Sequence, residues 1–156
     1  MKDISSFVTD LHASTLKKRQ AAAVELGKSG NLTAIEPLAA AFSDPHPAVR
    51  SDIAQALGRL GDSEAVPTLI TALNDPEPGI RCAAIAALGK IKDRAAVNPL
   101  IICLKDKDIT VRICAAEVLG KLGDKRATRP LTSLSEDPFS EVRDSARAAI
   151  VKLTKK

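Results

Sequence analysis

Residues 75–90 read DPEPGIRCAAIAALGK, and this stretch contains the pattern that decides the fold. Its Asp75, Arg81, Leu88 and Gly89 recur in other parts of the chain at a spacing of 31 residues. The arginine column is complete: Arg19, Arg50, Arg81, Arg112 and Arg143. Self-similarity at a fixed period of this size is typical of repeat proteins. We therefore predict five units, over residues 1–30, 31–61, 62–92, 93–123 and 124–156.

Other columns keep the same phase as the arginines. An aspartate stands six residues before the arginine in four units: Asp44, Asp75, Asp106 and Asp137. A glycine stands eight residues after it, again in four units: Gly27, Gly58, Gly89 and Gly120. Glycine inside a helix costs about 1 kcal/mol relative to alanine. We therefore expect a neighbouring helix to pack closely against each of these glycines.

The spacing within a unit predicts two helices. Val49, Ile53 and Leu57 recur at helical intervals in a stretch rich in alanine. The segment before each such stretch, for example 66–73, predicts a shorter apolar helix with a proline in its first turn. The residues placed to cap these shorter helices are Asn31, Asp62, Asp93 and Asp124. The residues placed to end the preceding longer helices are Gly30, Gly61 and Gly123, and Lys92 departs from this glycine pattern.

A single pair of helices cannot bury its own apolar face, so neighbouring pairs must stack. The predicted fold class is all-α, an α-solenoid of five two-helix repeats with a period of 31 in a single domain over residues 1–156. Polar residues replace apolar ones in the last unit, at Thr132, Ser135 and Arg147. We expect this unit to be a terminal cap and the chain to be a complete short solenoid.

Composition narrows the classes of protein further. Apolar residues make up 45% of the chain and charged residues 27%, with a net charge of +4. These values indicate a soluble globular protein. The sequence has no apolar stretch of about 20 residues that would span a membrane and no secretory signal. Three cysteines without CxxC spacing fit a reducing compartment, so we predict a cytoplasmic protein.

The segments DPEPGIR at 75–81 and AALGK at 86–90 resemble HEAT repeats of the phycobilisome-lyase type. The resemblance covers essentially the whole chain, although residues 1–30 match less well because they lack the turn aspartate. It implies a helical scaffold, and it raises a phycobilin lyase subunit or a bilin-handling chaperone-like protein as a possible function. The chain is short for a complete lyase subunit, and it has no Tyr or Trp to pack against a bilin.

The aspartate and arginine columns predict a structural ladder, in which each arginine bridges its own turn and the neighbouring turn. The equivalent residues have this role in the HEAT family, as the resemblance implies. Replacing Arg81 by alanine should then lower stability without affecting specific binding. The predicted ladder consists of Asp44, Arg50, Asp75, Arg81, Asp106, Arg112, Asp137 and Arg143.

The outward face of each longer helix lies one, five and nine residues after the arginine. By resemblance to the family, this face lines the concave groove. A binding surface must differ between units, and Cys82 and Ile113 stand where other units have polar residues. The predicted binding residues are Ser51, Gln55, Arg59, Cys82, Ala86, Lys90, Ile113, Glu117 and Lys121. The basic residue at the ninth position is also expected simply because cations stabilise the C-termini of helices.

Catalytic and metal-binding motifs are lacking. His12 and His46 lie in different units, and neither is followed by Glu, so the paired His-Glu motifs of deoxyhypusine hydroxylase are absent. Cys103 and Cys114 are expected in the core and Cys82 at the surface. We predict no catalytic residue, no metal and no cofactor.

The sequence thus predicts a non-catalytic scaffold that binds a protein or peptide in the groove, with a phycobilin lyase subunit as the alternative. A basic row this sparse, without Tyr or Trp as stacking platforms, makes nucleic acid an improbable partner. No membrane association is expected, and the protein is predicted to be a monomer or a weak oligomer.

Overall fold

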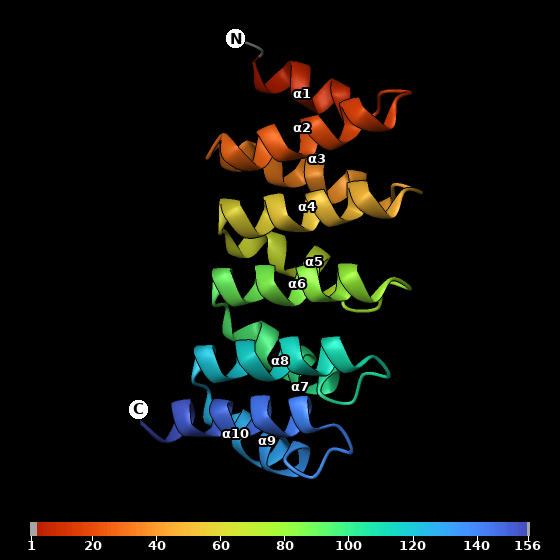
Figure 1. The fold of residues 1–156 in the computed structure, drawn as a ribbon. Helices are drawn as coiled ribbons and strands as arrows, with labels where there is room; N and C mark the ends of the chain where they lie inside the picture. Colours follow the sequence, from red (N-terminus) through yellow and green to blue (C-terminus); the bar gives the residue numbers. More distant parts are fainter. Residues whose placement is uncertain (1–2, 156) are drawn as a thin grey trace. The chain divides into compact units, whose positions relative to one another are not determined.

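The structure is a computed structural model and describes residues 3–155. Over this range the chain forms ten α-helices and five short 3₁₀ helices, with no strand (Figure 1). This confirms the all-α prediction. The helices group into two compact units, the first ending at Ile91 and the second beginning at Lys92. Each unit is described by itself, and the single-domain assignment stays a prediction.

The first unit contains three repeats. Its longer helices are α2 (Leu16–Lys28), α4 (Pro47–Leu60) and α6 (Pro78–Ile91), and its shorter helices are α1 (Ile4–Asp10), α3 (Ile35–Ala40) and α5 (Val66–Ala72). Its 3₁₀ helices are η1 (Leu32–Ala34), η2 (Ala41–Ser43) and η3 (Ser63–Ala65). The longer helices pack side by side, α2 on α4 and α4 on α6, while each shorter helix packs on the longer helix that follows it.

The second unit contains two repeats. Its longer helices are α8 (Ile109–Leu122) and α10 (Ser140–Thr154), and its shorter helices are α7 (Val97–Cys103) and α9 (Thr128–Leu134). Its 3₁₀ helices are η4 (Arg94–Ala96) and η5 (Lys125–Ala127). Helix α8 packs on α10, with α7 against α8 and α9 against α10. Between residues 3 and 155, none of the helices has the length and apolar character needed to cross a membrane.

The predicted capping residues cap the 3₁₀ helices that precede the shorter α-helices. The Asp62 side chain accepts a hydrogen bond from the Glu64 N–H at 2.9 Å, and Asn31, Asp93 and Asp124 make the equivalent bond. The shorter helices therefore begin one turn later than a direct cap would place them. The tight 3₁₀ turn accommodates this start, because 3₁₀ turns are frequent at the N-termini of α-helices.

The predicted helix stops have the left-handed backbone conformation that favours glycine. The φ angles of Gly61 and Gly123 are both 73°, and that of Gly30 is 66°. Lys92 has the same conformation, with a φ of 61°, although it carries a side chain. The turn at Lys92 therefore has the same geometry as the turns at the glycines. It is less favourable, because a left-handed conformation costs an L-residue about 1–2 kcal/mol.

Glycines on the longer helices lie against alanines of the neighbouring helix. A methyl group built on Gly58 would lie 2.7 Å from Ala87 Cβ, well inside contact distance. Gly27 meets Ala56 in the same way in the first unit, and Gly120 meets Ala149 in the second. The prediction of close helix packing at these three glycines is confirmed.

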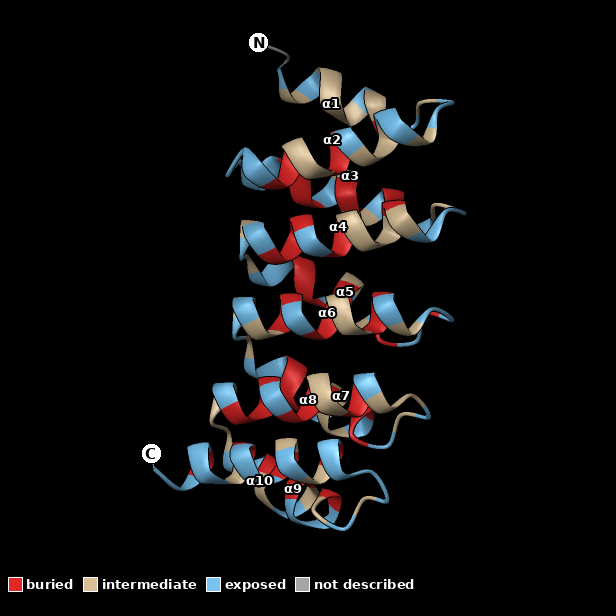
Figure 2. Cartoon of the chain, in the orientation of Figure 1, coloured by how far each residue is buried: buried red, intermediate tan, exposed pale blue. Residues whose placement is uncertain are grey.

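The core of each unit follows the periodicity predicted from the sequence. Buried residues line the sides of the helices that face their neighbours within a unit (Figure 2). Val49, Ile53 and Leu57 of α4 are fully buried, and so is the leucine that stands twelve residues before each arginine from Leu38 to Leu131. The dry contact between stacked helix pairs is the main source of stability in such a repeat fold.

Candidate functional site

The arginines hold the turns between helices through defined hydrogen bonds. Arg50 Nε donates to Asp75 Oδ2 at 2.8 Å, and Arg50 Nη2 donates to Asp75 Oδ1 at 3.1 Å. Arg50 Nη1 donates to the carbonyls of Asp44 and Pro45 in its own turn, at 2.9 and 3.3 Å. One guanidinium group therefore links two successive turns of the first unit.

Similar contacts are made by Arg112, a member of the predicted ladder, and by Arg19, which the predicted ladder did not include. Arg19 Nε donates to Asp44 Oδ2 at 2.6 Å, and Arg112 Nε lies 2.9 Å from Asp137 Oδ2. The Arg112 guanidinium carbon is also 5.7 Å from the centre of the Phe139 ring, a cation–π contact. Three of the arginines donate from Nη1 to the backbone carbonyl six residues earlier: Arg81 to Asp75, Arg112 to Asp106, and Arg143 to Asp137. Arg19 uses the Ala13 carbonyl in place of an aspartate carbonyl.

These contacts shift the pKa values of the turn carboxyls. Partial burial by itself raises the pKa of Asp75, but hydrogen bonds from the Arg50 side chain and the Glu77 amide outweigh it and hold the pKa below its ordinary value. The same balance lowers the pKa of Asp44, beside Arg19, and that of Asp137, beside Arg112. These three carboxylates are therefore ionised at neutral pH and act as fixed acceptors.

In the first unit, helices α4 and α6 present the predicted binding residues on neighbouring helices. Gln55, Arg59, Ala86 and Lys90 are exposed, whereas Ser51 and Cys82 are half-buried. Because α4 packs directly on α6, these six side chains belong to one patch of surface. Arg59 and Lys90 lie in the last turns of their helices, as predicted for cations that stabilise helix C-termini.

In the second unit, helix α8 presents the other three predicted residues, beside α10. Glu117 and Lys121 are exposed, but Ile113 is half-buried. Ile113 is therefore less exposed than its predicted place on the outward face implies. In α4, α6 and α8 the first position after the arginine lies at the edge of the packed helix surface, where neighbouring side chains cover part of it, so Ser51 and Cys82 are half-buried for the same reason.

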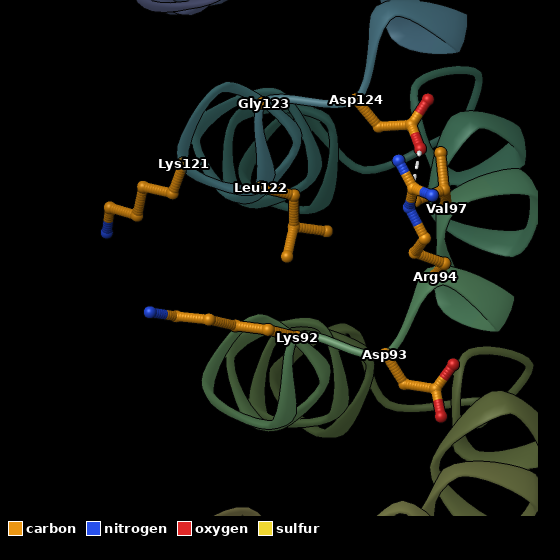
Figure 3. A pocket seen from close by; sticks show the side chains of 8 residues that line it. All are labelled: Lys92, Asp93, Arg94, Val97, Lys121, Leu122, Gly123 and Asp124. Carbon is orange, nitrogen blue, oxygen red and sulfur yellow. Dashed lines mark ion pairs between the residues drawn. The ribbon is translucent and has the colours of Figure 1, made fainter.

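A pocket of about 240 Å³ lies beside the C-terminus of α8 and includes the predicted residue Lys121. The side chains of Lys92 and Lys121 extend side by side, away from the pair formed by Arg94 and Asp124 (Figure 3). In that pair Arg94 Nε is 4.0 Å from Asp124 Oδ2. The pKa of Asp124 is lowered to about 2, chiefly by hydrogen bonds from the Arg126 side chain and backbone.

The cysteines differ partly from their predicted positions. Cys103 is buried, as predicted, but Cys114 is only partly buried, and so is Cys82. Cys114 follows Arg112 by two residues, at the margin of the helix face that packs inward. Within residues 3–155 no three His, Cys, Asp or Glu side chains lie close enough together to hold a metal ion.

Sequence analysis missed a basic surface on the shorter helices of the second unit. The short-helix segments 92–105 and 123–136 contain six basic residues, whereas the equivalent segments 31–43 and 62–74 contain none. We call this set the basic short-helix face: Lys92, Arg94, Lys105, Lys125, Arg126 and Arg129. All six are exposed. Counting charges separately for the shorter helices of each repeat would have found them, because the whole-chain net charge conceals the contrast.

Solved structures with this fold include proteins of different function. One is from the complex of CpcE and CpcF of phycocyanin lyase from Nostoc sp. PCC7120, with a TM-score of 0.84 and 29% identity. The match covers 100% of this chain and 66% of that chain, so this chain spans slightly less than two thirds of that protein's length. A designed armadillo repeat protein in complex with the peptide (KR)4 has a TM-score of 0.71 and 17% identity, covering 96% and 81%. Human deoxyhypusine hydroxylase has a TM-score of 0.56 and 17% identity, covering 98% and 85%.

The last two similarities show the fold alone, and they confirm the α-solenoid class. Comparison with curated protein sequences gave no match. The family model of HEAT repeats matches residues 8–78 and 66–151, which together span most of the chain. With the 31-residue period, the helix pairs and the phycocyanin lyase neighbour, this match confirms the resemblance read from the sequence: the chain belongs to the family of HEAT-repeat proteins.

Proposed function

We propose that this HEAT-repeat chain is a non-catalytic protein-interaction module that binds a protein or peptide on the exposed face of its longer helices. In the first unit the face consists of Ser51, Gln55, Arg59, Cys82, Ala86 and Lys90; in the second it consists of Ile113, Glu117 and Lys121. The half-buried Cys82 and Ile113 at the first position provide apolar anchors, and exposed residues at the ninth position provide a basic rim.

The observation that carries this proposal is the contrast between repeated and variable positions on one helix. The arginines and glycines that contact neighbouring turns and helices recur in nearly every repeat. In contrast, the first position after the arginine changes from Ser51 to Cys82 to Ile113, and the fifth from Gln55 to Ala86. Packing between repeats requires the recurring residues, whereas recognition of a particular partner requires residues that differ.

The similar structures support a binding role. The designed armadillo repeat protein was solved with a bound peptide, and the phycocyanin lyase protein was solved in a complex of CpcE and CpcF. Both show that stacked helix pairs can support a protein or peptide contact. Rigid helix faces are suited to this, because little conformational entropy is lost when they bind.

The test is affinity capture from native lysate with the wild-type chain and with Ile113→Glu, read by mass spectrometry. A charge at this half-buried anchor should abolish retention of the specific partner. The matched control is Leu32→Glu, which introduces the same charge at an exposed apolar residue of η1, outside the proposed face. Circular dichroism of both variants checks that the fold is retained.

A protein retained by the wild type and by Leu32→Glu, but lost with Ile113→Glu, would support the proposal. Recovery of the same set with all three chains, or of no protein with any of them, would contradict it.

A second candidate function is that of a phycobilin lyase subunit or bilin-handling protein, and the specific observation in its favour is the 29% identity to the phycocyanin lyase structure. The chain has no Tyr or Trp to pack against a tetrapyrrole. Titration with phycocyanobilin, followed by absorbance, tests this candidate. A saturable red shift and a coloured protein after gel filtration would support it, and unchanged absorbance would exclude it.

A further inference from the structure

An apolar cleft of about 460 Å³ opens between α7 and α9 in the second unit, on the side of the shorter helices. Ile101 and Leu104 of the α7 segment form one wall, and Pro130 and Leu134 of α9 form the other. Leu104 and Leu134 are only 4% and 8% exposed, so they form the deepest part of these walls. The volume lies within the range of about 300–1,000 Å³ that is typical of ligand pockets in proteins.

An exposed isoleucine follows Ile101 in the sequence. Ile102 is 72% exposed, more than any other large hydrophobic residue that the structure describes. The equivalent residues of the other four repeats are the small or polar Thr9, Ala40, Thr71 and Ser133. The repeat fold therefore does not require an isoleucine here. Ile102 does not itself line the cleft, so the proposal below rests on the residues that do.

Positive charge surrounds the cleft. Lys105 and Arg129 line it, one from each side, and both belong to the basic short-helix face. Among residues 3–155 neither has an ion-pair partner. Their charges are therefore available to a ligand, at the edge of a low-dielectric apolar surface where charge pairing is stronger than in open water.

Within residues 3–155 no aspartate forms an ion pair with Lys105 or Arg129, and the aspartates near the cleft are held by other groups. Asp93 accepts a hydrogen bond from the Ala95 N–H, and Asp124 pairs with Arg126 at 2.9 Å. Asp106 accepts from the Asp108 N–H, and Asp137 pairs with Arg112. The two short-helix segments contain three acidic residues, Asp93, Asp124 and Glu136, against six basic ones, which leaves a net positive charge.

From the cleft and its charges we infer that the α7–α9 cleft is a second docking site, specific for an acidic amphipathic helix of a partner protein. Leucine-like side chains one turn apart enter between Leu104 and Leu134, while Asp or Glu residues beside them pair with Lys105 and Arg129. This is the helix-in-groove mode of recognition. A nucleic acid backbone would satisfy the two cations but would leave the apolar walls uncovered. The site is separate from the face of the longer helices and does not depend on the function proposed there.

The experiment is a selection of displayed random peptides of about 16 residues, long enough for about four helical turns. Selection uses the full chain, with counter-selection on the double variant Lys105→Glu/Arg129→Glu. We expect enriched peptides to combine spaced Leu, Ile or Phe with several Asp or Glu residues. Their affinity should fall by about tenfold or more on the double variant, and it should weaken as salt is raised.

Two further variants separate the cleft from the charge. Ser133→Phe introduces a large side chain into the lining of the cleft without changing any charge, and it should also abolish peptide binding. The matched control, Glu36→Lys/Glu64→Lys, reverses two exposed charges on shorter segments of the first unit and should leave binding unchanged. Thermal melts followed by circular dichroism verify that each variant is folded.

The inference is overturned if no peptide is enriched, if the enriched peptides are not acidic, or if they bind the double variant equally well. It is also overturned if duplex DNA or a phosphatidylserine vesicle binds the wild-type chain more tightly than the best peptide does and binds the double variant no longer. A third contradicting result is a dimer of the wild-type chain in sedimentation that the double variant does not form, because a second copy of the chain would then occupy the cleft.

Discussion

At the scale of single residues, Arg50 joins two turns with one side chain. Its guanidinium group donates to both carboxylate oxygens of Asp75 and to two backbone carbonyls. Both side chains are largely buried, with 13% and 5% of their surface exposed. Bidentate arginine–carboxylate pairs of this kind are among the stronger polar contacts in proteins.

We predict that Arg50→Ala lowers the free energy of unfolding by about 2–4 kcal/mol, because it leaves a buried carboxylate and two carbonyls without their donor. Urea denaturation measures the loss. Arg59→Ala is the control: Arg59 is exposed, so its loss should change stability by less than about 0.5 kcal/mol. Equal effects of the two substitutions would contradict a structural role for the ladder.

A second prediction at this scale concerns two glycines in neighbouring helices. Gly58→Ala should destabilise the protein by about 1–3 kcal/mol, since its new methyl group would overlap Ala87. Gly79→Ala, at a helical position with nothing within 4 Å, should instead stabilise it by about 0.5–1 kcal/mol through helix propensity. Thermal melts of the two variants should therefore shift in opposite directions, and shifts of the same sign would refute the close-packing argument.

At the scale of the element, the turns depend on ionised carboxylates. The pKa values of Asp44, Asp75 and Asp137 lie below their ordinary value in the folded protein. Unfolded aspartate has a pKa of about 3.9, so the unfolded chain binds protons more readily. The stabilisation is fully present above that pH and is lost as the pH falls through the lower, folded values.

We therefore predict that the urea midpoint is steady from neutral pH to about pH 5 and falls steeply below about pH 4. Asp75→Asn should be less stable than the wild type at neutral pH and should show a shallower decline in acid, because one of the linked carboxyls is gone. Equilibrium unfolding across this pH range tests both statements. A variant whose decline is parallel to that of the wild type would show that Asp75 does not contribute.

At the scale of the whole molecule, the chain comprises two compact units with three and two repeats. Repeat arrays generally need at least about three repeats to bury enough apolar surface for stability. We predict that a fragment of residues 1–91 unfolds cooperatively on heating, whereas a fragment of residues 92–156 does not. Circular dichroism melts of each isolated fragment test this prediction. A cooperative transition of the fragment of residues 92–156 would contradict it.

Much of this architecture is predictable from the sequence because each repeat places the same residue types at the same positions. The helix pairs, the glycine–alanine contacts and the left-handed helix stops follow from columns that recur every 31 residues. The starts of the shorter helices are less predictable, since Asp62 and its equivalents cap a 3₁₀ turn instead of the α-helix itself. The degree to which Ile113 and Cys114 are covered also depends on neighbouring side chains that no single column specifies.

The sequence by itself determined the repeat fold and the family, because packing a helix pair against its neighbour demands the same apolar and arginine positions in every repeat and a glycine in four of the five. It also contained the charge contrast between the shorter helices of different repeats. Only the tertiary structure decided that Lys105 and Arg129 flank one apolar cleft, and that Cys114 is only partly buried. The physical reason is that a cleft forms where two helices that are distant in sequence leave space between them, and that separation depends on all the side chains packed beneath them.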